Sequence, residues 1–196
     1  MRVKMMLPID PLMTEHRLIE KMIRLMAQET ARIRDNMAVS PEFAFVNPKF
    51  IDAAVDFICG YADRIHHGKE EEIFFLALEQ KPLSWEHLEI MQELQQEHGW
   101  GRQTTARLAA AKENYANGSP DSLAEVLGLM EALVDFYPRH IALEDQHFFL
   151  PVMAYFTQAE QEALLQQMSE FDKDFDHQGY QKMVTDWEAC GCKCHL

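Results

Sequence analysis

Two stretches of the chain carry the same metal-ligating residue types at the same spacing. Residues 66–76 read HHGKEEEIFFL and residues 140–150 read HIALEDQHFFL, so both contain His-x-x-x-Glu and end in Phe-Phe-Leu at the same offset. On a helix, a spacing of four places the histidine and the glutamate one turn apart on one face. Each stretch could therefore hold one cation, and imidazole together with carboxylate suits iron, manganese or zinc.

The repeat selects between two registers in the first stretch. His67 and Glu71 have the same spacing as His66 and Glu70, but only the second pair aligns the two Phe-Phe-Leu runs. The apolar stripe over residues 51–65 also places His66 nearer its centre than His67. We therefore predict His66 and Glu70 as ligands, with His67 pointing outward.

Two further histidines fall on the apolar faces of predicted helices. His16 lies within the stripe of the first helical pattern, and His98 follows Leu94 by four residues on the stripe of the third. A single inward histidine is more often a satisfied core residue than a ligand, but several such histidines in one chain favour ligation. His87 lies about 16 Å from His98 along the helix axis, so we expect it to be structural or exposed.

Six residues are the predicted metal ligands, and no catalytic residue is assigned. They are His16, His66, Glu70, His98, His140 and Glu144. This set exceeds the needs of one closed zinc site, which is usually four-coordinate. It fits two metal ions bridged by the two carboxylates.

Helical periodicity predicts the elements that must position these ligands. The expected helices cover residues 11–37, 48–79, 84–116, 120 to beyond 140, and 157–175. Ser84 begins the third of them, and Asn47, Ser119 and Thr157 are expected N-caps of three others. Pro138 lies within the fourth pattern, where we expect a kink or a short break.

These elements predict an all-α fold, an up-down-up-down four-helix bundle with a short additional C-terminal helix. Short turns between the long helices favour this arrangement, and such bundles place metal sites in their cores. We expect residues 1–175 to form the bundle with its di-metal site and residues 176–196 to form a Cys-rich C-terminal tail.

The expected tail holds most of the cysteines. Periodicity is lost after Asp176, and Cys190, Cys192 and Cys194 stand beside His195 at the end of the chain. The simplest interpretation is a flexible thiol-rich tail. A structural zinc site, or an arm that transfers electrons or metal to the bundle, are the alternatives.

Composition limits the environment and the partners. The chain has 196 residues, 47% of them hydrophobic, which suffices for one well-buried domain. Its formal net charge of -14 makes nucleic acid and anionic membrane surfaces poor partners. No apolar run approaches the roughly 18 residues of a spanning helix, and no signal-peptide pattern is present, so we expect a cytoplasmic protein.

Taken together, these motifs resemble the hemerythrin-like family of His-His-Glu cation-binding domains. The resemblance covers residues 11–155, and its matching parts are Glu15-His16, residues 66–71, Glu97-His98 with Gly101-Arg102, and residues 140–145. It implies a four-helix bundle with a non-haem di-iron centre and bridging carboxylates. Such a centre would hold two iron ions, with manganese or zinc as alternatives, and would handle oxygen, nitric oxide or iron itself.

The sequence departs from the oxygen-carrying hemerythrins at two positions. Those proteins have a further histidine where this chain has Leu94, and they space the last acid one residue later, at Asp145 here. One imidazole fewer would leave an extra exchangeable position on a metal. The resemblance then implies a protein that binds or reacts with a small oxidant in sensing, storage or stress response. The alternatives are a di-iron oxidase, peroxidase or nitric-oxide reductase served by an electron donor, and an iron donor for iron–sulfur repair.

Overall fold

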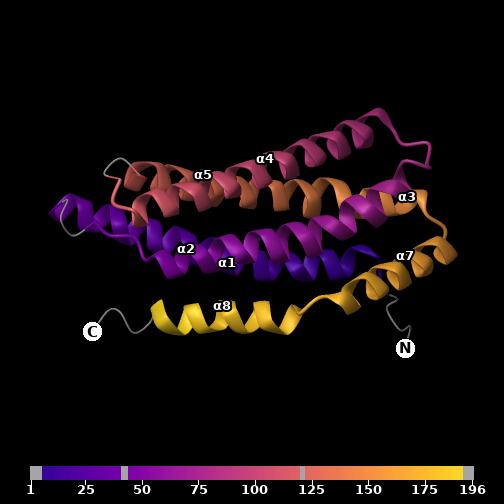
Figure 1. The fold of residues 1–196 in the computed structure, drawn as a ribbon. Coiled ribbons are helices and arrows are strands. Elements are labelled where there is room, and N and C mark those ends of the chain that lie inside the picture. The colour runs from indigo at the N-terminus through magenta and orange to yellow at the C-terminus, as the bar shows by residue number, and fades with distance from the viewer. Residues whose placement is uncertain (1–5, 41–43, 120–121, 192–196) are drawn as a thin grey trace.

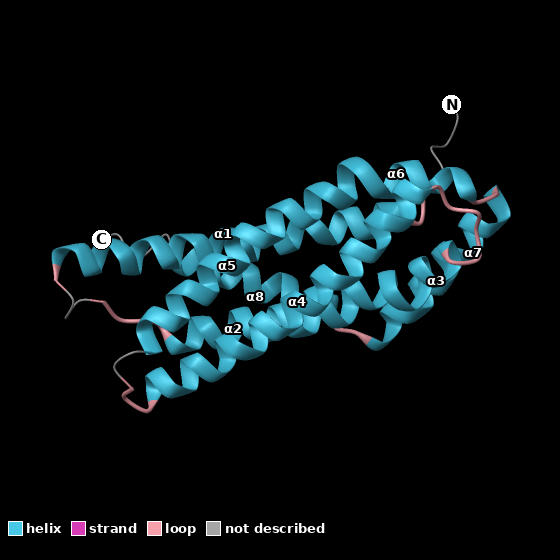
Figure 2. Ribbon diagram, turned by 90° about the horizontal axis from the view of Figure 1, so that it is seen from above, coloured by secondary structure: helices cyan, strands magenta, loops and turns pink. Residues whose placement is uncertain are grey.

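The computed structural model describes residues 6–40, 44–119 and 122–191. Their regular structure is entirely helical, with no strand in the described ranges (Figure 2). The long helices α1 (Ile9–Val39), α4 (Trp85–Ala116) and α5 (Ser122–Leu143) lie lengthwise beside the helix that begins as α2 (Pro48–Phe57) (Figure 1). Contacts join α1 to α5, α5 to α4, α4 to α2 and α2 to α1, so these segments surround a common interior. The predicted all-α class is confirmed.

Two of the long helices change geometry where they carry the repeated motif. α2 continues into the π-helices η2 (Ile58–His67) and η3 (Glu70–Phe75), and then into α3 (Leu76–Leu78). α5 continues into the π-helix η4 (Glu144–Phe148), followed by α6 (Phe149–Val152) and η5 (Met153–Tyr155). π-helical turns are rare and often lie at functional sites. α5 runs through Pro138 without a break, which was one of the two expectations, and it changes to a π-helix at Glu144.

Three of the predicted helix starts are confirmed by side-chain caps. The Asn47 side chain accepts a hydrogen bond from the Lys49 backbone N–H, and the Ser84 side chain accepts one from His87. Thr157 forms a capping box with Glu160 at the start of α7 (Gln158–Phe171). These caps satisfy backbone donors that have no partner within the helix.

The expectation of a tail without helical periodicity is wrong for residues 177–191. After η6 (Asp172–Asp174), the chain forms α8 (His177–Gly191), which packs against α1. Val184 is fully buried, and the Trp187 ring lies 5.2 Å from that of Phe50. Tyr180, Met183, Val184 and Trp187 are spaced by three and four and pack against the core, so α8 does contain a short apolar stripe that the expectation missed. Cys190 has an exposed free thiol, while Cys192, Cys194 and His195 lie outside the described residues.

Apolar side chains form two buried clusters with a polar layer between them. One cluster contains Ile19, Ile65 and Tyr137, and the other contains Leu12 and Phe149. His16 therefore sits between the clusters, as does the stretch from residue 66 to residue 70. Among the described helices, none is long and apolar enough to cross a membrane.

Gly60 allows α8 to pack closely on η2. A Cβ atom at this position would lie 1.8 Å from the hydroxyl oxygen of Tyr180. We expect Gly60→Ala to lower the free energy of unfolding by about 1–3 kcal/mol, because the Tyr180 ring must move out of its packed position. Urea unfolding of the metal-free protein measures the change.

Gly128→Ala is the matched control. A Cβ atom at Gly128, which is also helical, meets no atom within 4 Å. Since alanine favours a helix more than glycine does, the free energy of unfolding of this variant should rise by about 0.5–1 kcal/mol. Equal effects of the two substitutions would contradict the close packing of α8.

Candidate metal centre

Seven ionisable side chains fill the polar layer. Each is at most 2% exposed, although charged or polar groups are rarely so deeply buried without partners. They are His16 from α1, His66 and His67 from η2, Glu70 from η3, His98 from α4, His140 from α5 and Glu144 from η4. The layer thus gathers all six predicted ligands and adds His67.

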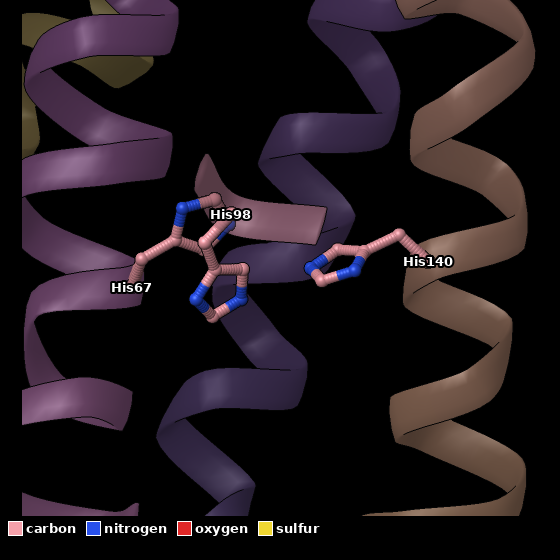
Figure 3. A group of neighbouring side chains, drawn as sticks. All are labelled: His67, His98 and His140. Carbon is pink, nitrogen blue, oxygen red and sulfur yellow. The ribbon is translucent and has the colours of Figure 1, made fainter. Parts of the chain in front are cut away.

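The donor atoms fall into two groups. His16, His66, Glu70 and Glu144 form one, and His67, His98 and His140 form the other; within each group the donor atoms lie within 4.8 Å of one another. Figure 3 shows the three rings of the second group turned toward one another from their separate helices. The His67 and His98 rings stack at 3.8 Å. Each group has the size and donor chemistry of a single cation site.

Glu70 and Glu144 each face both groups. Glu70 places Oε1 3.5 Å from Nε2 of His66 and Oε2 3.4 Å from Nε2 of His98. Glu144 places Oε2 3.1 Å from Nε2 of His16 and Oε1 3.4 Å from Nε2 of His140. A carboxylate with one oxygen toward each of two cations bridges them, so this geometry supports the predicted bridging arrangement.

Most of these inward atoms have no hydrogen-bond partner. Within the described chain, both oxygens of Glu70 and of Glu144, and Nε2 of His67, His98 and His140, are buried and unpaired. Each buried unpaired polar atom costs about 1–3 kcal/mol, and more if it is charged. Cations would satisfy all seven atoms at once. The residues therefore fit a pair of metal ions.

The predicted outward position of His67 is wrong. His67 is 2% exposed and belongs to the group with His98 and His140. A π-helix has more residues per turn than an α-helix, so successive side chains point in closer directions, and η2 turns both His66 and His67 inward. The described part of the chain thus has five inward imidazoles, and Leu94 lies in an apolar cluster instead. The inward His67 therefore corrects the expectation, drawn from Leu94, that the centre has one imidazole fewer.

Each inward histidine is held from behind by a carboxylate on its other ring nitrogen. The Nδ1 to carboxylate pairs are His16–Asp145 at 2.8 Å, His66–Glu15 at 3.0 Å, His67–Asp63 at 3.4 Å, His98–Glu71 at 2.7 Å and His140–Glu97 at 2.7 Å. Such a carboxylate fixes the ring orientation and leaves Nε2 free to bind a metal. Sequence reasoning assigned these acids no role, although four of them directly adjoin a predicted ligand.

The family comparison agrees with this geometry. Residues 7–152 match the hemerythrin HHE cation binding domain. The chain belongs to this family. The match contains all seven inward side chains of the hemerythrin-like domain and ends before α7 and α8. A comparison with curated proteins found no match.

Burial and mutual repulsion distribute protons over the metal-free centre. Burial and the neighbouring Glu144 raise the pKa of Glu70. Burial also opposes ionisation of Glu144, but His140, His16 and His98 outweigh it and lower its pKa. Burial would lower the pKa of His16, yet the hydrogen-bonded carboxylate of Asp145 and the neighbouring carboxylate of Glu144 raise it to about 9. At neutral pH the metal-free hemerythrin-like domain therefore carries a proton on His16.

The stability of the metal-free fold and the affinity for metal should change in opposite directions between pH 6.5 and pH 9. The raised pKa of His16 stabilises the metal-free fold below its unfolded value of 6.5, and this contribution is lost as pH rises through about 9. Metal must displace the same proton, so metal affinity should rise over this window. Urea unfolding and titration calorimetry in two buffers of different ionisation enthalpy measure both effects. Metal uptake without proton release near pH 7 would contradict the assignment.

Basic side chains complete the outer layer. Arg102 donates to Asp63 at 2.6 Å and to Glu71 at 2.7 Å, and so supports the carboxylates behind His67 and His98. Lys69 is fully buried and contacts Glu15, the carboxylate behind His66. Three of the acids that enclose the centre are therefore themselves paired with bases.

The C-terminal helices reach the centre through Lys69. Its Nζ lies 2.8 Å from Oδ1 of Asp172, between α7 and α8. The neighbouring Gly68 admits the Phe171 ring, since a Cβ atom there would lie 2.9 Å from Cζ of Phe171. Residues 68–69 are thus covered by a segment beyond the matched family domain.

Lys69→Met should be strongly destabilising. The substitution keeps the volume but leaves Glu15 and Asp172 without their shared cation, which should cost about 3–5 kcal/mol of unfolding free energy. Lys173→Met is the matched control, because Lys173 pairs with Glu170 in solvent and its loss should cost at most about 1 kcal/mol. Equal midpoints in urea for the two variants would show that the buried pair contributes nothing.

Proposed function

We propose that this hemerythrin-like domain is a non-haem di-iron protein that binds or reacts with a small oxidant, oxygen or nitric oxide. The observation that carries the proposal is the pair of donor groups joined by Glu70 and Glu144. Imidazole and carboxylate suit iron, and also manganese or zinc. The proposal takes the long helical segments as an up-down-up-down bundle, in which four inner faces surround one site.

The two groups offer different numbers of donors. With both carboxylates shared, His16 and His66 provide a four-donor site, whereas the three other histidines provide a five-donor site. A six-coordinate ion would keep more exchangeable positions beside His16 and His66. We therefore assign the approach of the small oxidant to this side. Two iron ions supply redox electrons to such an oxidant when they are bound.

The chain's own side chains would shield and orient this reaction. The Phe149 ring stacks on His16 at 5.7 Å, and apolar clusters lie on both sides of the polar layer. These groups exclude water, which strengthens electrostatic interactions within the layer. The outer carboxylates hold the imidazoles in place, which favours retention of the metals over their donation for iron–sulfur repair. A role in sensing, storage or stress response fits a retained centre, and a redox enzyme is the alternative.

Metal counting tests the donor set. Purified protein supplied with ferrous iron should bind two ions per chain, and His67→Ala should bind one of them more weakly in competition with a chelator, because that site falls from five donors to four. His87→Ala should bind as much as wild type, since the His87 ring hydrogen-bonds Tyr155 and belongs to neither donor group. Elemental analysis together with the optical spectrum of the air-oxidised protein gives the result. Full loading of the His67 variant under the same competition would remove this residue from the site.

Rapid mixing separates the functional alternatives. The ferrous protein is mixed anaerobically with oxygen or nitric oxide and followed by absorbance. A stable adduct supports binding, and repeated oxidation with turnover supports an enzyme. Loss of iron to a chelator under the same conditions supports donation. A protein that takes up no ferrous iron would overturn the proposal.

A further inference from the structure

A surface groove between α4 and α5 approaches the five-donor side of the centre. It has a volume of about 450 Å³, and its lining includes Glu93, Glu97, Trp100, Asp135, Phe136 and Arg139. Trp100 is 40% exposed there, whereas Phe136 beneath it is 8% exposed. Nothing in the oxidant reaction argued above uses these residues except Glu97.

Two contacts lead from this groove to His140. The Trp100 ring lies 4.7 Å from the Phe136 ring, which stacks at 5.2 Å and 21° on His140. Glu97, in the wall of the same groove, accepts a hydrogen bond from Nδ1 of His140 at 2.7 Å. Both routes end on an imidazole whose Nε2 faces the metal layer. Electron tunnelling falls steeply with distance and is faster through packed atoms than through gaps.

We propose that this groove is where electrons enter the centre, from a one-electron carrier protein with basic side chains around the exposed edge of its redox cofactor. The inference rests on the proposed di-iron function. In each transfer the reduced carrier loses one electron and one ferric ion becomes ferrous. No atom, proton or leaving group changes place between the two proteins.

Charge identifies the kind of partner. The groove holds three acids, Glu93, Glu97 and Asp135, against the single base Arg139, and the whole chain carries a net charge of -14. Such a field attracts a basic surface over a distance and disfavours an acidic one. The half-exposed Trp100 supplies a flat apolar contact of the kind enriched at protein interfaces.

The start of α4 offers a matched control surface. Trp85 is 77% exposed, and Glu86 and Glu89 beside it are also exposed. Among the described residues, Trp85 makes no ring contact with an inward histidine, unlike the Trp100 series. Substitutions here likewise remove one exposed tryptophan and two acids, without touching the route to His140.

The test runs the electron path in reverse with a basic c-type cytochrome as the probe. The ferrous protein is mixed anaerobically with the ferric cytochrome, and haem reduction is followed by stopped-flow absorbance. Trp100→Leu should slow the reaction several-fold, and Glu93→Gln with Asp135→Asn should slow it about tenfold at low salt. Trp85→Leu, and Glu86→Gln with Glu89→Gln, should react as wild type. High salt should remove the effect of the acidic substitutions, because they act through long-range attraction.

Binding to the metal-free protein gives a readout that does not need iron. Calorimetric titration with the same cytochrome should show weaker binding for the Trp100 and Glu93/Asp135 variants and unchanged binding for the controls. If wild type takes up iron but all variants bind the cytochrome and react with it alike, electrons enter elsewhere. The inference about the groove then fails, while the proposed di-iron function stands. If no iron is taken up, the proposed function fails, and the titration still shows whether the groove binds a basic carrier. A cytochrome with an acidic rim that reacts faster than the basic one would also overturn the inference.

Discussion

The structure depends on the burial of seven ionisable side chains in the middle of a helical bundle. An uncompensated charge at this depth is far more costly than any single packing interaction is favourable, so each group must have a counter-charge. The chain supplies these in successive layers. Carboxylates stand behind the imidazoles, and Arg102, Lys69 and Arg17 stand behind several of the carboxylates. The innermost positions, between Glu70 and Glu144, are left for cations.

This layering also explains why the centre lies between two apolar clusters. The clusters keep water from the inward atoms, so that electrostatic contacts within the layer are strong. They also make the helices rigid on either side of it. The ligands come from segments as distant as α1 and η4, and packing on both sides fixes their mutual distances before any cation binds.

The sequence predicted much of this arrangement, and its failures have physical reasons. Apolar periodicity placed His16 and His98 inward, and the repeat placed Glu70 and Glu144 on equivalent turns; the structure gathers all of them, while metal binding itself stays a prediction. His67 was misplaced because the reasoning assumed an α-helix throughout, whereas η2 is a π-helix. Helix propensities do not reveal such a turn. The paired histidines were the only local signal, and an α-helical period excludes one of them.

The prediction of a C-terminal tail without helical periodicity was wrong for a different reason. α8 carries a short apolar stripe that the prediction overlooked, and the partners of this stripe, such as Gly60 beneath Tyr180, cannot be read from periodicity. Likewise, nothing near residue 172 indicates that Asp172 would reach Lys69. Contacts of this kind are set by tertiary packing between distant segments, and a single sequence contains no pattern for them.

Because Asp172 follows the helices of the centre in the sequence, its contact with Lys69 can form only late during synthesis on the ribosome. The helices that carry the inward side chains are complete by residue 148, but the anion that accompanies Lys69 emerges more than twenty residues later. A nascent bundle would hold this ammonium group with only Glu15 beside it. The environment of His66 therefore reaches its final form only after translation has passed the last part of α7.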